Sequence, residues 1–135
     1  ERFRKHVDQI PALQALLGSY AVALFALVAQ SAACNRMHSL VERSARWLLM
    51  THDRVAADDF RMTHDFLSEM LGVCRPSISV AAEALRSAGC ITYHRGEITV
   101  LDRRGLEAAS CECYGLVRER FDRLPGRREA ASHTQ

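Results

Sequence analysis

A long uncharged stretch dominates the first third of the chain. Residues 9–35 contain no charged side chain, and residues 20–29 are strongly apolar. Within this stretch a repeat with spacing that alternates between four and three residues marks the seam of a coiled coil. The seam positions are Leu13, Leu17, Tyr20, Leu24, Leu27 and Ser31, followed by Cys34 and His38. The pattern predicts a helix from Pro11 to about Arg36 that buries its seam in a dimer.

Two other uses of this helix stay open. A membrane span needs about 20 apolar residues, and the uncharged stretch is long enough for one. The segment is interrupted by small and polar residues, which favours the dimer helix: Gln14, Gly18, Ser19, Gln30 and Ser31. The remaining alternative is a core helix of a domain that continues upstream of the chain.

Two shorter amphipathic helices follow at residues 63–89, with a tight turn between them. Thr63 is a suitable N-cap for the first helix, and Gly72 can end it with a positive φ. Pro76 is tolerated in the first turn of the second helix, which Gly89 closes. The expected buried positions are Phe66, Leu67, Met70 and Leu71 in the first helix and Ile78, Ala81, Ala82 and Leu85 in the second. This order is typical of a helix-turn-helix.

The opposite face of the second helix carries the candidate chemistry. The start of a recognition helix meets base edges in the major groove, where an arginine can donate two hydrogen bonds to guanine. A serine hydroxyl near the helix-start amides can bind a phosphate, and an apolar side chain can touch a thymine methyl group. The residues on this face are Arg75, Ser77, Ser79, Val80 and Glu83. The alternatives are a solvated helix-start arginine at Arg75 and an edge-of-core residue at Val80.

A β-hairpin is expected directly after the helix-turn-helix. Residues 91–94 and 97–100 alternate between apolar and polar side chains, and only Arg95 and Gly96 separate them. This spacing predicts two strands joined by a two-residue turn. His94 and Arg95 at its tip are assigned to the DNA backbone, although a plain exposed turn would look the same.

The remaining segments complete the expected architecture. A short helix is predicted over residues 2–9, and longer helices over residues 38–53 and 102–124. Asp102 is the expected N-cap of the last helix. Residues 60–62 are expected to form a short extended piece. We divide the chain into a sensor-domain remnant and dimerisation helix (1–38), a winged helix-turn-helix domain (39–124) and a disordered tail (125–135). The expected fold class is mainly helical, with a small β-hairpin wing.

Composition and cysteine usage add little to this picture. The formal net charge is only +2, so local placement of charge must carry any attraction to DNA. The five cysteines are expected to be reduced thiols of a cytoplasmic protein. No CxxC or HxxxH spacing indicates a metal, so no metal or cofactor is expected, and no catalytic constellation indicates an enzyme. Cys111 and Cys113 are expected on a helix surface, while Cys74 is either a packing residue or a redox-sensitive thiol.

The run THDFLSEMLGVCRPSISVAAEALRSAGCITYHRGEITVLDRRGLEAASCECYG resembles the C-terminal region of Crp/Fnr-type bacterial transcription regulators. The resemblance implies a homodimer whose paired helix-turn-helix units bind a palindromic DNA site, with RNA polymerase as a further partner. By position it assigns Arg75 to a base, and His64, Ser77 and His94 to phosphates, with Thr63 beside them. Ser79 and Val80 would face the groove.

Two departures from that family are evident. Its best-known members have a glutamate at the position of Pro76 and a second arginine at that of Val80, so a different base sequence is expected to be read. Family members also carry an N-terminal β-roll sensor domain, and no strand-rich segment precedes the long helix here. We therefore expect this chain to be a fragment of a longer regulator. A protein-interaction module that binds no DNA, and a regulator anchored through residues 9–35, are the competing functions.

Overall fold

A computed structural model describes residues 3, 7, 9–55 and 57–124 of the chain. These residues form two compact units, of which one comprises the chain up to Ser31 together with the part from Gly115 onward, and the other comprises residues 32–114. The helix expected over residues 2–9 falls mostly outside the described residues, and the tail expected from residue 125 falls wholly outside them.

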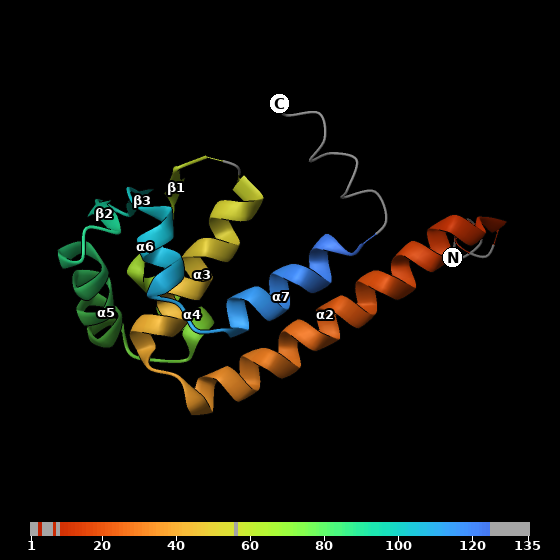
Figure 1. The fold of residues 1–135 in the computed structure, drawn as a ribbon, viewed down its shortest axis with the longest axis horizontal. Coiled ribbons are helices and arrows are strands. Elements are labelled where there is room, and N and C mark those ends of the chain that lie inside the picture. The colour runs from red at the N-terminus through yellow and green to blue at the C-terminus, as the bar shows by residue number, and fades with distance from the viewer. Residues whose placement is uncertain (1–2, 4–6, 8, 56, 125–135) are drawn as a thin grey trace. The chain divides into compact units, whose positions relative to one another are not determined.

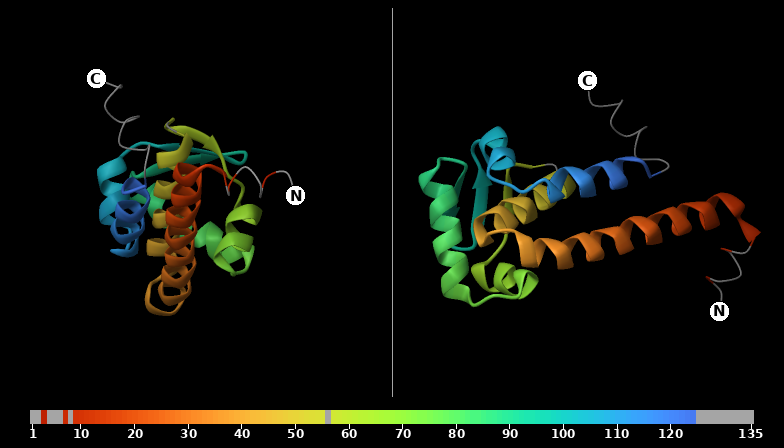
Figure 2. Two further views of the ribbon diagram at one scale, coloured as in Figure 1. Left: turned by 90° about the vertical axis from the view of Figure 1, so that its right-hand side faces the viewer. Right: turned by 60° about the horizontal axis from the view of Figure 1, so that its bottom comes forward.

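The first unit consists of two antiparallel helices. Helix α2 (Pro11–Met37) supplies its residues up to Ser31, and helix α7 (Cys113–Asp122) supplies those from Gly115. The two run side by side in this unit (Figures 1 and 2). The rings of Tyr20 and Phe121 meet edge-on with their centroids 6.3 Å apart. Helix α2 begins at Pro11, as expected for a residue whose missing amide hydrogen costs nothing in a first turn.

The second unit packs four helices around one core. They are α3 (Leu40–Val55), α4 (His64–Leu71), α5 (Arg75–Ser87) and α6 (Arg103–Ala108), and Figure 1 shows α3 in their midst. Large side chains that are almost fully buried come from α3, α5, α6 and the sheet: Leu48, Leu49, Ile78, Leu85, Ile91, Ile98 and Leu106. Arg43 of α3 donates a hydrogen bond to the carbonyl of Leu71 and so caps the end of α4.

Local sequence signals define the helix-turn-helix. The Thr63 hydroxyl accepts a hydrogen bond from the amide of Phe66 at 3.1 Å, which caps α4. Gly72 ends α4 with φ of 64° in the left-handed region, and α5 begins with a proline in its first turn. Leu67 and Leu71 are buried as expected, but Phe66 and Met70 are 48% and 43% exposed, so the prediction that they belong to the core was wrong. The short α4 turns only one of its faces to α5.

The hairpin forms with the expected register and gains a third strand. Strands β2 (Ile91–His94) and β3 (Glu97–Val100) pair antiparallel, and β1 (Asp59–Arg61) adds to the free edge of β3. Arg95 and Gly96 have φ of 50° and 86°, the two positive values that a tight hairpin turn of this type needs. The mainly helical fold with a long helix and a small β-hairpin wing is confirmed.

The C-terminal helix expected over residues 102–124 is in fact two helices. Asp102 caps α6 as predicted, accepting a hydrogen bond from the amide of Gly105 at 2.9 Å. The helix then stops at Ala108, and α7 starts at Cys113. Cys111 and Cys113 are 4% and 1% exposed, so their expected place on a helix surface was wrong. Two residues that are two apart in one helix point in different directions, and the break lets both enter the interior.

Candidate nucleic-acid interface

The N-terminal half of α5 presents a polar face beside its buried stripe. Ile78, Ala81 and Leu85 point into the core, which turns the intervening positions outward. Arg75, Ser79 and Val80 are exposed and Ser77 is half-buried. Val80 is 72% exposed, an unusual position for a valine, and it borders a groove of about 250 Å³ between α3 and α5.

Arg75 is tied to the neighbouring helix. Its Nε lies 3.1 Å from a carboxylate oxygen of Asp65 in the first turn of α4, and both side chains are well exposed. An exposed ion pair of this kind contributes little to stability because water screens it. The pair therefore orients the guanidinium at the start of α5 without holding it firmly.

His64 joins α4, α5 and the sheet. Its Nδ1 lies 3.1 Å from the hydroxyl oxygen of Ser79, and its ring stacks on Tyr93 of β2 with centroids 4.1 Å apart and planes 15° from parallel. Its Nε2 is covered and has no hydrogen-bond partner among the described residues. Burial, and then the charge of Arg75, lowers the pKa of His64, so the ring is held neutral. No role for Tyr93 was predicted from the sequence. The only sequence signal for it is its position on a strand with alternating apolar and polar residues.

Cys74 and Ser77 form a second polar pair at the start of α5. The exposed Cys74 is the N-cap residue, and its Sγ lies 3.0 Å from the Ser77 hydroxyl oxygen. Hydrogen bonds from the hydroxyl and then the amide of Ser77 lower the pKa of the Cys74 thiol. Both side chains lie at the N-terminal end of α5, where the helix dipole favours an anion.

The wing is fixed against the start of α4. The amide of Met62 donates to the carbonyl of Gly96 at 2.9 Å, and a Cβ added at Gly96 would lie 3.3 Å from the methyl group of Thr63. The adjoining His94 and Arg95 are exposed at the tip. The structure thus brings Thr63, the wing tip and the start of α5 onto one part of the second unit, linked through His64.

The residues expected to form the dimer seam have mixed environments within the first unit. Leu13, Leu17, Leu27 and Ser31 are half-buried, whereas Tyr20 packs on Phe121 and Leu24 is exposed. Its close neighbours Val22, Phe25 and Val28 are 61–76% exposed. Cys34, expected to continue the seam, is instead buried in the second unit. There its sulfur lies close to the sulfurs of Cys111 and Cys113 and to a ring nitrogen of His38.

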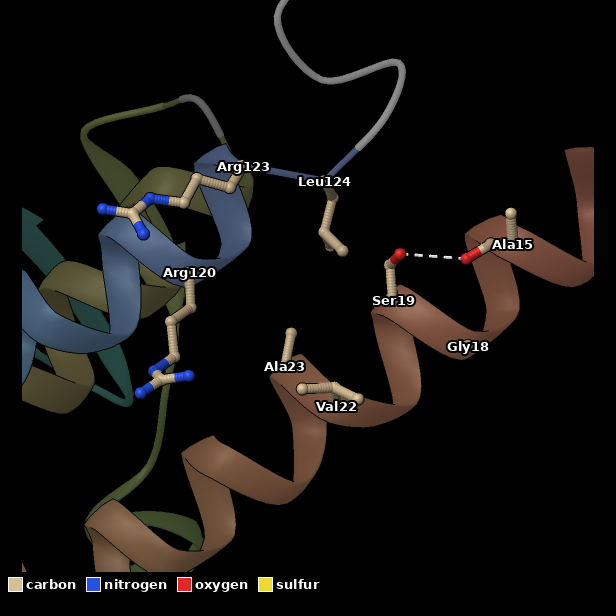
Figure 3. A pocket seen from close by; sticks show the side chains of 8 residues that line it. All are labelled: Ala15, Gly18, Ser19, Val22, Ala23, Arg120, Arg123 and Leu124. Atoms are coloured by element: carbon tan, nitrogen blue, oxygen red, sulfur yellow. Dashed lines mark hydrogen bonds between the residues drawn. The ribbon is translucent and has the colours of Figure 1, made fainter.

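Small residues of α2 leave a groove beside α7. The groove measures about 540 Å³, and Figure 3 shows the side chains around it. Its α2 side is built from Ala15, Gly18, Ser19, Val22 and Ala23, and its α7 side from Arg120 and Arg123 with Leu124 beyond the helix end.

By length and composition α2 could cross a membrane, although core helices of soluble proteins meet the same criterion.

Comparisons with known proteins bear on the second unit most directly. The family model of the Crp-like helix-turn-helix domain matches residues 42–109. A solved structure described as a transcriptional regulator of the Crp/Fnr family from Eubacterium rectale has a TM-score of 0.61 and 22% identity, over 76% of this chain and 48% of that one. The catabolite activator protein of Thermus thermophilus has a TM-score of 0.46 and 21% identity, over 85% of this chain and 52% of that one.

The chain thus spans about half the length of these two solved structures. No curated protein matches it.

Proposed function

The chain belongs to the family of Crp-like helix-turn-helix domains, the DNA-binding domains of transcription regulators, and we propose that it binds a palindromic DNA site sequence-specifically as a homodimer. The observation that carries this proposal is the N-terminal face of α5, where an arginine, two serines and an exposed valine lie together at the positive end of the helix dipole. Members of this family regulate transcription and are not enzymes. Such a role assigns the protein to the cytoplasm.

Arg75 is the proposed base-reading residue. It is the first residue of α5, and its guanidinium reaches a carboxylate only through an exposed contact that DNA can replace. Bidentate donation to the O6 and N7 atoms of guanine would provide the discrimination. Val80, five residues on, supplies an apolar contact of the kind that fits a thymine methyl group.

Phosphate contacts are proposed on both sides of this helix. Ser77 lies beside the helix-start amides, and His94 and Arg95 at the wing tip face solvent. Such contacts fix the register of the protein on the duplex without reading sequence. Because Nδ1 of His64 bonds to Ser79 and its Nε2 is covered, we assign His64 to positioning these elements rather than to a direct phosphate contact. Thr63 acts in the same way through its cap and its contact with the wing.

Dimerisation is proposed through α2. Leu24, Phe25 and Val28 form an exposed apolar surface on this helix, and a contiguous patch of this kind marks a site of contact with another protein or with a membrane. A second copy of α2 is the occupant that a two-fold DNA site requires. The two recognition helices would then lie about 34 Å apart, one turn of DNA. RNA polymerase as a further partner remains a proposal from the resemblance.

A mobility-shift titration over a series of salt concentrations tests DNA binding. Duplexes with random and palindromic sequence are compared, and phosphate contacts predict a steep loss of affinity with salt. Arg75→Ala should lower affinity for the preferred site about tenfold or more and reduce sequence preference. Arg86→Ala is the matched control, because it removes the same charge near the other end of α5. Equal affinities of the two variants would overturn the assignment of Arg75.

The competing function is a winged-helix protein-interaction module. Ion pairs within the unit, such as that of Arg86 with Glu83, leave little unbalanced positive charge on α5, which is the observation in its favour. It predicts no duplex binding even at low salt, with an intact fold by circular dichroism. A monomeric protein that needs detergent for solubility would instead favour the membrane-anchored alternative for α2.

A further inference from the structure

Three cysteines and one histidine from distant parts of the sequence meet inside the second unit. Cys34 and His38 lie one turn apart near the end of α2, Cys111 lies between α6 and α7, and Cys113 begins α7. One ligand atom from each of the four lies within 4.8 Å of all the others. The three cysteines are 1–4% exposed and His38 is half-buried. No disulfide joins any of the chain's five cysteines, all of which are described.

The separations between these atoms fit a tetrahedron around a single ion. Zinc binds thiolate sulfur at about 2.3 Å and imidazole nitrogen at about 2.0–2.1 Å, so two sulfurs on one ion lie about 3.8 Å apart and a sulfur and a nitrogen about 3.6 Å apart. Here Sγ of Cys34 lies 3.6 Å from Sγ of Cys111. Sγ of Cys113 lies 3.6 Å from Nδ1 of His38. A multi-iron cluster would need its ligands spread around several metal atoms.

The far side of His38 carries the partner that a metal-bound histidine needs. Its Nε2 lies 3.2 Å from a carboxylate oxygen of Glu112, while Nδ1 faces the sulfurs. A ligating histidine commonly donates its second N–H to a carboxylate, which fixes the ring and its tautomer. Glu112 stands between Cys111 and Cys113 in the sequence, so one short segment supplies two ligands and the group that orients a third.

The surrounding charge also suits a zinc ion bound by three thiolates. Three thiolates, one neutral imidazole and Zn²⁺ together carry a net charge of −1. Arg46 of α3, only 2% exposed, acts electrostatically on Cys34 and can balance that charge. Zinc binds cysteine as the thiolate, so the three thiols would lose their protons as the ion binds.

We propose that Cys34, His38, Cys111 and Cys113 bind one Zn²⁺ ion in a closed tetrahedral site. Four protein ligands leave no position for water or substrate, so the site is structural. It fastens the end of α2 to the segment between α6 and α7. The two halves of the ligand set, C-x₃-H and C-x-C, lie more than 70 residues apart, and neither has the spacing by which zinc sites are usually recognised.

Metal content and cobalt substitution test the proposal. The full chain, purified without chelator, should contain one zinc per chain by mass spectrometry of its metals. Metal-free protein titrated with Co²⁺ should develop the visible bands of a tetrahedral ion and a strong near-ultraviolet sulfur-to-cobalt charge-transfer band, saturating at one equivalent. Cys113→Ser should lose most of that charge-transfer absorption and bind zinc at least tenfold more weakly. Cys74→Ser, which removes an exposed cysteine outside the cluster, is the matched control and should keep one zinc per chain.

A conservative variant guards against misfolding. His38→Cys keeps four ligands, so it should still bind one cobalt and show stronger sulfur-to-cobalt absorption than the wild type. The proposal is overturned if wild-type protein holds no zinc and shows no charge-transfer band, or if Cys113→Ser and Cys74→Ser bind the metal equally. A cobalt spectrum typical of octahedral coordination by oxygen would also overturn it. None of these outcomes depends on DNA binding.

Discussion

The Nε atom of Arg75 lies 3.1 Å from a carboxylate oxygen of Asp65, and this pair links the first turns of α5 and α4. The contact sets an arginine at the start of the recognition helix, but it also places a carboxylate where DNA phosphates would approach. In the proposed complex Asp65 would have two opposing effects: it would orient Arg75 before binding and compete with DNA for it afterwards. The balance decides how strongly this interface binds.

Asp65→Asn should raise affinity for duplex DNA by up to about fivefold, the range of an exposed ion pair. The change frees Arg75 and removes a negative charge from the interface. The measurement is a mobility-shift titration at fixed salt. The double variant with Arg75→Ala supplies the control, because much of the gain should vanish when no arginine is present. A fall in affinity for Asp65→Asn alone would mean that orientation of Arg75 outweighs competition.

Stability should depend on pH through His64. Burial, and then the charge of Arg75, lowers its pKa in the folded protein below the ordinary value of about 6.5. The unfolded chain then binds more protons than the folded one between these two pKa values, so the free energy of unfolding rises with pH there. Its contribution is fully present above about pH 6.5 and falls as pH drops toward the folded pKa. Urea unfolding between pH 5 and pH 8 measures this slope.

The matched variants for this test are His64→Gln and His94→Gln. His64→Gln should flatten the pH dependence below neutral pH, since glutamine does not titrate. His94→Gln changes an exposed histidine of the wing and should keep the slope of the wild type. The same slope in the His64→Gln variant would show that another group is responsible.

Gly96→Ala should lower the free energy of unfolding by about 1–2 kcal/mol. Its φ of 86° is costly for any residue with a Cβ, and the added carbon would press on the Thr63 methyl group at 3.3 Å. Gly115→Ala is the control, because that glycine lies in a helix with open space around it and should become more stable by about 0.5–1 kcal/mol. Chemical denaturation measures both, and an unchanged stability for Gly96→Ala would contradict the tight-turn geometry.

Phe25→Glu should convert the proposed dimer into a monomer. Phe25 is 76% exposed on α2, and a carboxylate there would have to be buried against the second copy. Sedimentation measures the mass, and affinity for a palindromic site should fall about 100-fold because the two halves no longer bind together. Gln14→Glu places the same charge at another exposed position of α2 and should remain dimeric. Dimers in both variants would move the interface elsewhere.

The sequence by itself determined the helix-turn-helix and its wing. Thr63 as a cap, Gly72 in a left-handed conformation and Arg95–Gly96 in a tight turn are short-range effects, because each depends on hydrogen bonds and φ angles of a few adjacent residues. The exposed positions of Arg75, Ser79 and Val80 follow from the same local periodicity once the buried stripe of α5 is known.

Only the tertiary structure decided the long-range relationships. The stacking of His64 on Tyr93 joins residues 29 positions apart, and the meeting of Cys34 with Cys111 spans 77 positions. Local sequence patterns carry no information about contacts between residues so far apart. The break between α6 and α7 accompanies such contacts, so helix propensity did not predict it. Residues two apart in one helix point to different faces. Cys111 and Cys113 can both be buried in the same cluster only because the helix is interrupted between them.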